Sequence, residues 1–186
     1  ATQPVKHFVL MVFLVALGAG AVVRAASPGP GVGSIAPEFK AKNIVTGDTV
    51  DLNAERGKLV ILTFWATWCA PCRRELPILE RAQEYLGKSR LTVLAVDFQD
   101  SEDAVAAVKK IAKPWQISLL RDGYGRIASR YKITAIPHLF MIDRDGKIVA
   151  NHTGYGDKSL AELVADINNA LGADIPADEH STPVPR

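Results

Sequence analysis

The two cysteines of the chain, Cys69 and Cys72, lie in the segment Cys69-Ala70-Pro71-Cys72. An apolar run typical of a buried strand ends just before them, and a helical pattern begins at Pro71. Pro71 has the fixed φ angle of a first helical position, so Cys69 is expected at the helix N-terminus. Unpaired amides and the helix dipole there favour a thiolate, the attacking species in disulfide exchange. The spacing therefore predicts a redox-active pair.

Three other uses of such a pair compete with redox chemistry. A structural disulfide that closes so short a loop would contribute only about 2 kcal/mol. Two buried free thiols fit poorly, because Trp68 and the corner between strand and helix place the pair near the surface. A zinc site takes four ligands, and Cys69 and Cys72 supply two. We favour redox chemistry because the pair joins a strand to a helix in a chain expected to be exported.

The elements that must position this pair can be read from the hydrophobic pattern. Residues 58–65 form a near-continuous apolar strand, and residues 71–86 form an amphipathic helix. The remaining pattern predicts strands at 39–44, 49–52, 91–96, 139–142 and 147–152, and helices at 101–113, 125–131 and 158–171. Turn residues 46–48 and 143–146 join two of these strand pairs as hairpins. The pattern predicts an α/β fold with a mixed central sheet flanked by helices.

The ends of the chain differ in composition from this central region. Residues 8–23 carry no charge and follow Lys6, and as a helix they would span about 24 Å, less than a bilayer core. We expect residues 1–25 to be a secretory signal or, if Arg24 prevents cleavage, a membrane anchor. Residues 26–37 have the composition of a Pro/Gly linker, residues 38–172 of the folded domain, and residues 173–186 of a disordered tail.

Composition narrows the function further. The net charge is only +2, from 22 Lys and Arg against 20 Asp and Glu, which does not fit a nucleic-acid partner. Hydrophobic residues make up 48% of the chain, enough to build a folded core. We expect no bound cofactor.

The segment FWATWCAPCRRELP, residues 64–77, resembles the active-site segment of thioredoxin-fold proteins of the TlpA/ResA type. The resemblance extends over residues 35–171. It implies a thioredoxin fold with an N-terminal β-hairpin extension, and an exported, often membrane-anchored thiol–disulfide oxidoreductase of the periplasm. It also implies partners: disulfide-bearing or thiol proteins such as apocytochrome c, and a membrane electron donor that restores the dithiol.

The same resemblance assigns roles to further residues. Ile136 and Pro137 would form the docking edge for substrate, with Pro137 in cis and facing the cysteines, although a plain trans proline at a strand entry is the simpler interpretation. Trp68 would cover the sulfurs and touch substrate. Glu75 would take and return the proton of Cys72, where an ordinary acidic residue in a helical first turn is the alternative. Thioredoxins carry a buried Asp at the position of Thr63, and its replacement by threonine moves the proton transfer toward Glu75.

Two other functions compete with a disulfide oxidoreductase. Cys69, Cys72 and His138 could together bind copper in a copper-delivery protein, although a histidine that starts a strand usually has another role. Thiol peroxidases of this fold place Pro-x-x-x-Thr/Ser-x-x-Cys around the attacking cysteine. Leu62 and Ala66 occupy the proline and Thr/Ser positions here, so we rank a peroxidase last.

Overall fold

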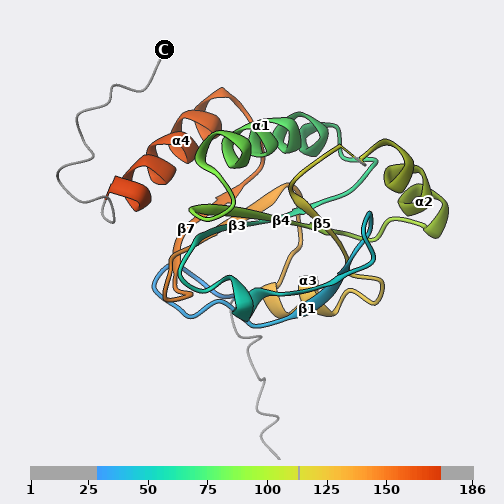
Figure 1. Ribbon diagram of the computed structural model, residues 1–186, viewed down its shortest axis with the longest axis horizontal. Helices are drawn as coiled ribbons and strands as arrows, with labels where there is room; N and C mark the ends of the chain where they lie inside the picture. Colours follow the sequence, from blue (N-terminus) through green and yellow to red (C-terminus); the bar gives the residue numbers. More distant parts are fainter. Residues whose placement is uncertain (1–28, 113, 173–186) are drawn as a thin grey trace, which may run out of the picture.

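The computed structural model describes residues 29–112 and 114–172, without the side chains of 157–160 (Figure 1). These residues form a seven-stranded sheet with the order β2-β1-β5-β4-β3-β6-β7. The strands are β1 (Lys40–Asn43), β2 (Thr49–Asp51), β3 (Leu59–Trp65), β4 (Leu91–Asp97), β5 (Ser118–Arg121), β6 (His138–Ile142) and β7 (Ile148–Thr153). The helices are α1 (Ala70–Leu86), α2 (Glu102–Ile111), α3 (Arg126–Tyr131) and α4 (Asp157–Gly172), with a 3-10 turn η1 (Leu52–Glu55).

The central strand β3 contributes side chains to both hydrophobic cores of the molecule. It pairs with β4 in parallel and with β6 antiparallel, and all seven of its residues are buried. Alternate side chains therefore enter two separate cores. Ile61 and Trp65 pack in the core that contains residues of α1 and α4, whereas Leu62 and Phe64 pack with residues of α3. Figure 1 shows α1 and α4 on one side of the sheet and α3 on the other. The mixed sheet flanked by helices is confirmed.

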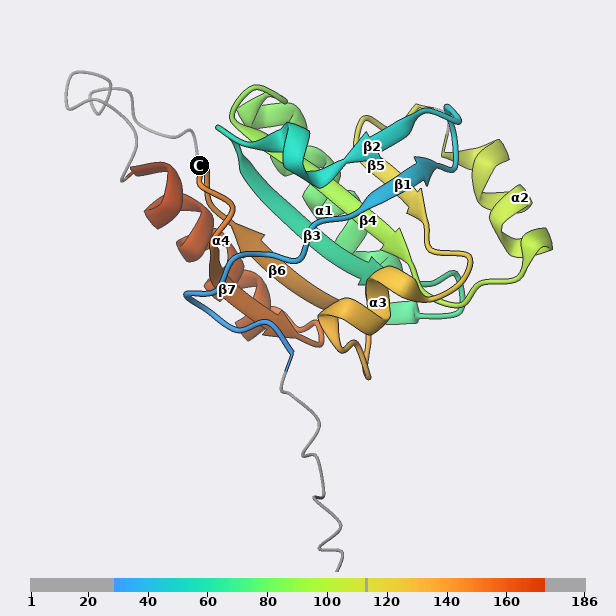
Figure 2. The ribbon, with the colours of Figure 1, turned by 90° about the horizontal axis from the view of Figure 1, so that it is seen from below.

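The N-terminal hairpin extends this sheet, as expected from the resemblance. β1 and β2 pair antiparallel, and β1 also pairs antiparallel with β5, with Lys42 opposite Arg121. Figure 2 shows the hairpin lying beside β5. β5 therefore has a strand on each side, β4 on one and β1 on the other.

The folded domain begins before residue 38. The N–H of Gly33 donates to the carbonyl of Ile148, and the N–H of Ala36 donates to the carbonyl of Gly146. Ile35 forms an isolated antiparallel bridge with Lys147, and Ala36 is buried. Figure 2 shows this segment running beside β7. The last residues of the predicted linker are thus bonded to an edge of the sheet, because its open backbone groups supply partners.

Other element boundaries differ modestly from the sequence pattern. The pattern does not predict the strand β5, because Ser118–Arg121 is only four residues long and has no clear alternation. The helix α2 ends at Ile111, two residues earlier than expected. The predicted signal or anchor (1–25) and tail (173–186) lie outside the described residues. Within residues 29–112 and 114–172, we find no helix of the length and apolar character needed to cross a membrane.

Candidate active site

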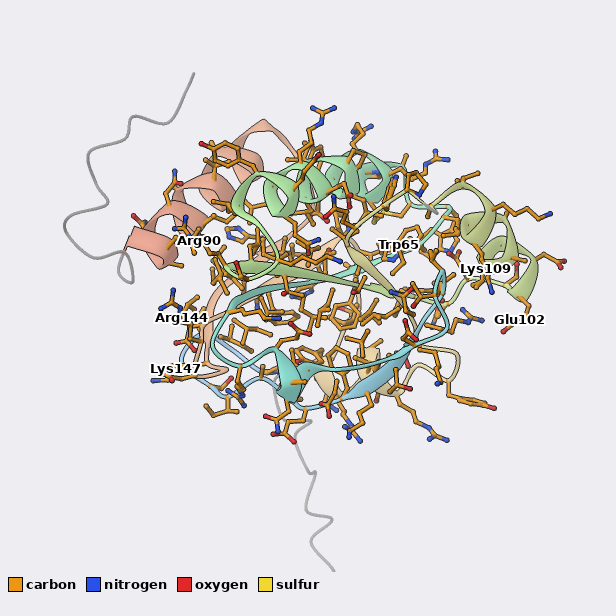
Figure 3. All side chains as sticks on the ribbon, in the orientation of Figure 1. Trp65, Arg90, Glu102, Lys109, Arg144 and Lys147 are labelled. Atoms are coloured by element: carbon orange, nitrogen blue, oxygen red, sulfur yellow. A yellow bond between two sulfur atoms is a disulfide. The ribbon has the colours of Figure 1, made fainter. Side chains whose placement is uncertain are left out.

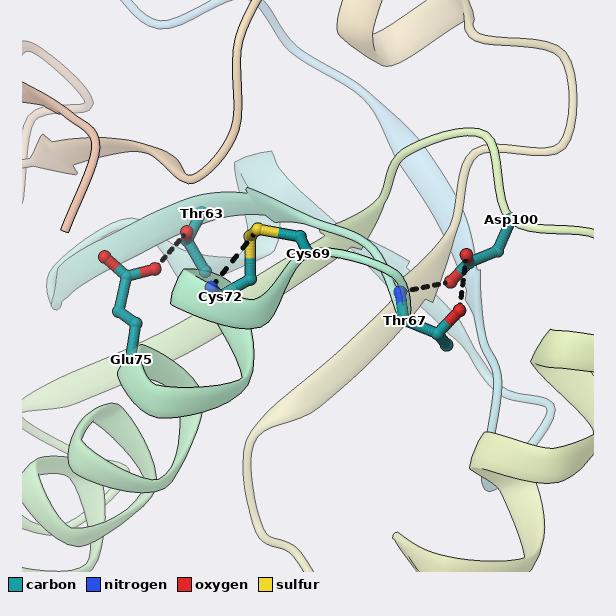
Figure 4. Close-up of a disulfide and its surroundings, with 6 residues drawn as sticks. All are labelled: Thr63, Thr67, Cys69, Cys72, Glu75 and Asp100. Atoms are coloured by element: carbon teal, nitrogen blue, oxygen red, sulfur yellow. Dashed lines mark hydrogen bonds between the residues drawn. A yellow bond between two sulfur atoms is a disulfide. The ribbon is translucent and has the colours of Figure 1, made fainter.

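Cys69 and Cys72 form a disulfide at the start of α1 (Figure 4). Cys69 is the N-cap residue, and its Sγ accepts a 3.2 Å hydrogen bond from the N–H of Cys72. Pro71 lies at the second helical position, one later than predicted, because the helix begins at Ala70. Cys69 is 5% exposed and Cys72 is fully buried. A helix N-terminus stabilises negative charge, so Cys69 is the sulfur placed to become a thiolate after reduction.

Asp100 anchors the loop that leads into the cysteine pair. Its carboxylate accepts two hydrogen bonds from Thr67, one from the N–H at 2.9 Å and one from the hydroxyl at 2.7 Å. Figure 4 shows this pair on the side of the disulfide opposite Glu75. The contact fixes the backbone two residues before Cys69. The sequence pattern does not reveal it, although residues just beyond the carboxyl end of a parallel strand commonly form sites.

A cluster of charged side chains lies beside Asp100, with Asp97 buried and Glu102 exposed. The Arg121 guanidinium pairs with Asp97 and Glu102, and it donates to the carbonyl of Asp100 at 3.1 Å. Burial and the neighbouring Asp100 carboxyl raise the pKa of Asp97 to about 6, despite Arg121. Arg121 thereby ties the end of β5 to the loop after β4, and so holds Asp100 against Thr67.

Glu75 is buried on α1, one turn after Cys72, with 5% exposure. The Thr63 hydroxyl donates a 3.0 Å hydrogen bond to Oε2 of Glu75. Burial raises the pKa of Glu75 to about 7, and the bond from Thr63 opposes some of this rise. The residue that departs from the thioredoxin pattern therefore contacts the carboxyl that is predicted to handle protons.

Ile136 and Pro137 lie at the start of β6, beside the end of β3. The peptide bond between them is cis, as expected. His138 pairs with Phe64 in the antiparallel register, so Pro137 comes opposite the stretch that leads to Cys69. Pro137 is buried and Ile136 half-buried. Trp68 precedes Cys69 and is 61% exposed, whereas Trp65 is buried and its Nε1 donates to the carbonyl of Ala95 at 3.3 Å.

His138 has partners of its own. Its Nε2 lies 2.7 Å from Oδ1 of Asn151, and its ring stacks on Phe140 with centroids 4.6 Å apart. Burial lowers its pKa. Among the residues the structure describes, no three His, Cys, Asp or Glu side chains are grouped to hold a metal ion. The arrangement does not favour a copper site built from Cys69, Cys72 and His138.

Several known proteins are similar to this chain in sequence or in fold. The AhpC/TSA family model matches residues 32–151. The thioredoxin-like protein YneN of Bacillus subtilis is 35% identical over 73% of this chain and 79% of its own length. Thiol-disulfide oxidoreductase ResA of Geobacillus kaustophilus is 31% identical, over 66% and 70%. A Chlorobium tepidum structure described as a thiol:disulfide interchange protein DsbE aligns with a TM-score of 0.69 at 29% identity, over 77% and 99%.

The thioredoxin fold and the disulfide at the N-terminus of α1 define a thiol–disulfide oxidoreductase. The chain belongs to the AhpC/TSA family, and within it to the ResA-like proteins that its active-site segment resembles. Because Leu62 and Ala66 replace the peroxidase residues before Cys69, family membership does not bring peroxidase chemistry with it.

Proposed function

We propose that this protein is an exported disulfide reductase that uses Cys69 and Cys72 to reduce disulfides of partner proteins outside the cytoplasm. The observation that carries the proposal is the buried Glu75 carboxyl one helical turn after Cys72, on the helix that Cys69 caps. A capped cysteine supplies the attacking thiolate, and a carboxyl with a pKa of about 7 can exchange a proton at neutral pH.

The reaction transfers two electrons from the dithiol to the partner. The Cys69 thiolate attacks one sulfur of the partner's disulfide, so a bond forms to Cys69 Sγ while the partner's S–S bond breaks and its other sulfur leaves as a thiolate. Cys72 gives up its proton and attacks Sγ of Cys69. The Cys69–Cys72 disulfide forms, and the second partner sulfur leaves. The proton of Cys72 passes to Glu75, and two protons from water complete the partner's two thiols.

Glu75 is the group proposed to accept the proton of Cys72 and to return it when the pair is reduced again. The carboxyl is withdrawn from water, so it is protonated and ionised in comparable amounts near neutral pH. That condition is the one in which a single group serves as both acid and base.

Ile136, Pro137 and Trp68 are proposed to bind the partner. The start of β6 lies beside the end of β3, and Trp68 offers a large exposed ring next to Cys69. Aromatic side chains with such exposure frequently dominate binding energy in protein interfaces.

The expected partners are disulfide-bearing or thiol proteins of the periplasm, with apocytochrome c as the type implied by the resemblance to ResA. A membrane electron donor would return two electrons to the Cys69–Cys72 disulfide after each cycle. The charge-free segment 8–23 after Lys6 supports export, either with cleavage or with anchoring in the inner membrane.

The direction of electron flow is tested by the reduction potential of the pair, measured by equilibrating residues 29–186 with defined thiol buffers. We expect a value of about −270 mV, which is typical of a reductant. A value of about −120 mV is typical of an oxidant and would reverse the proposed direction. The absence of a reversible two-electron couple would rule out the reductase.

The partner is tested by trapping. Cys72→Ser leaves Cys69 able to attack but removes the sulfur that releases the product. We expect this variant to retain partner proteins as mixed disulfides in the periplasm, and Cys69→Ser to retain none. Equal retention by both variants would contradict the assignment of Cys69 as the attacking residue.

A further inference from the structure

An apolar groove of about 450 Å³ lies between α1 and α2. Its walls include Trp65 at the end of β3, Pro77 on α1, Ala107 and Ile111 on α2, and Trp115 in the loop that follows. Figure 3 labels Trp65 in this region, with Glu102 and Lys109 on the adjoining α2. A hollow of this size and character is typical of a binding site.

The groove is open to solvent at its apolar rim. Ile111 is 76% exposed, although it is a large aliphatic residue on a helix of the folded domain. The indole N–H of Trp65 is already bonded to the carbonyl of Ala95, so the ring offers apolar surface to the groove. Exposed apolar surface grouped around a hollow marks an interaction site more often than a scattered exposed residue does.

The end of the groove nearest the disulfide is polar and positively charged. Thr67 and Arg73 line it; Thr67 lies two residues before Cys69, and Arg73 directly follows Cys72. Arg73 is the one charged residue in the lining and is exposed. Among the described residues, no ion pair involves Arg73. An acidic group would therefore be attracted to this end of the groove.

From this geometry, and resting on the proposed reductase function, we infer that the groove is a substrate subsite for a partner polypeptide. It takes a bulky apolar side chain close to the partner's reactive cysteine, while an acidic side chain of the partner faces Arg73. Because Thr67 and Arg73 lie close to the cysteine pair and also line the groove, a polypeptide whose sulfur lies at Cys69 can extend from the docking edge at Trp68 over this opening. Because the groove adjoins the disulfide, a substrate fits as its occupant better than a second copy of the chain does.

The test uses synthetic peptides, each joined to glutathione as a mixed disulfide through a single cysteine. Phe and Glu are scanned over the four positions on either side of the cysteine in a Ser/Gly background. We expect at least one Phe position to raise kcat/KM for reduction about tenfold over the all-Ser peptide, which is the effect of filling an apolar pocket. Glutathione disulfide alone serves as a substrate too small to reach the groove.

Two neighbouring positions on α2 give a matched pair of variants. Ala107→Trp fills the groove, whereas Ala106→Trp adds the same ring at an exposed position outside the lining. We call the rise in kcat/KM that Phe gives over the all-Ser peptide the Phe advantage, and we expect it to disappear in Ala107→Trp and to remain in Ala106→Trp. Both variants should reduce glutathione disulfide equally. At least one Glu position should also raise kcat/KM over the all-Ser peptide, and Arg73→Glu should remove this gain while the control Arg74→Glu keeps it. The inference therefore stays testable if Ala107→Trp fails to fold.

Three results would overturn the inference. The first is normal reduction of glutathione disulfide without any Phe advantage. The second is an equal loss of the Phe advantage in Ala106→Trp and Ala107→Trp. The third is a wild-type dimer in solution that Ala107→Trp converts into a monomer, because the groove would then bind a second copy. Failure to reduce even glutathione disulfide would instead refute the proposed reductase, and the subsite with it.

Discussion

Thr63 donates a hydrogen bond of 3.0 Å to Glu75, and both side chains are withdrawn from water. Thr63 lies on the central strand and Glu75 on the helix that begins at the disulfide. The carboxyl proposed to move protons therefore comes from α1, while the strand position supplies a hydroxyl that binds it. A hydroxyl donor favours the ionised carboxylate, whereas burial favours the protonated form, and burial is the larger effect.

Glu75→Gln should change how stability depends on pH. The folded pKa is about 7 against an ordinary value of 4.5, so between these values the folded protein holds a proton that the unfolded chain has released. Stability of the wild type should therefore fall as pH rises from about 4.5 through 7, by roughly 3 kcal/mol in total. Glutamine does not ionise, so this loss should be absent in the variant. Thermal unfolding of the oxidised protein between pH 4 and pH 8 measures the difference.

The matching control is Thr63→Val, which removes the donor and keeps the carboxyl. The pKa of Glu75 should then rise further, and the fall in stability should extend to higher pH. If wild type and Glu75→Gln show the same slope across this range, Glu75 does not titrate as inferred.

The two hydrogen bonds between Thr67 and Asp100 should stabilise the loop before Cys69. Thr67→Val removes one of them and should cost about 1 kcal/mol of unfolding free energy. Asp100→Ala removes both and leaves a backbone N–H without its acceptor, so about 2 to 3 kcal/mol is expected. Denaturant unfolding of the oxidised forms measures both. An Asp100→Ala variant no less stable than Thr67→Val would show that the contact does not hold the loop.

Trp68→Ala should impair partner binding and leave folding intact. The side chain is 61% exposed, so its loss should change the unfolding free energy by less than about 0.5 kcal/mol. Reduction of a protein disulfide should slow by about tenfold in kcat/KM. Tyr85→Ala, at the end of α1 far from the cysteine pair and 67% exposed, is the control and should react like the wild type. Equal effects of the two substitutions would argue against a docking role for Trp68.

His138→Ala should not weaken copper binding by the reduced protein. The imidazole is engaged with Asn151 and Phe140 in the oxidised structure, and its lowered pKa follows from burial. Titration of the reduced wild type and variant with Cu(I) in the presence of a competing chelator compares the affinities. A clear loss of affinity in His138→Ala would restore the copper alternative.

The local pattern is sufficient to locate most elements. Hydrophobic periodicity and turn residues within short stretches predict the strand β3, the helix after Pro71 and the hairpin that ends the sheet. The strand β5 escapes prediction because four residues carry too little periodicity, and it is a strand only because β4 and β1 offer it hydrogen bonds on both sides.

The sequence by itself determined the reactive pair, since the spacing of Cys69 and Cys72 and the strand-to-helix junction are local properties of the chain. Only the tertiary structure decided what surrounds them. Asp100 reaches Thr67 across 33 positions of sequence, and Thr63 reaches Glu75 across 12. Burial of that carboxyl, and hence its pKa, is a property of the packed core. The local sequence pattern does not predict these contacts, because they form only when separate elements pack together.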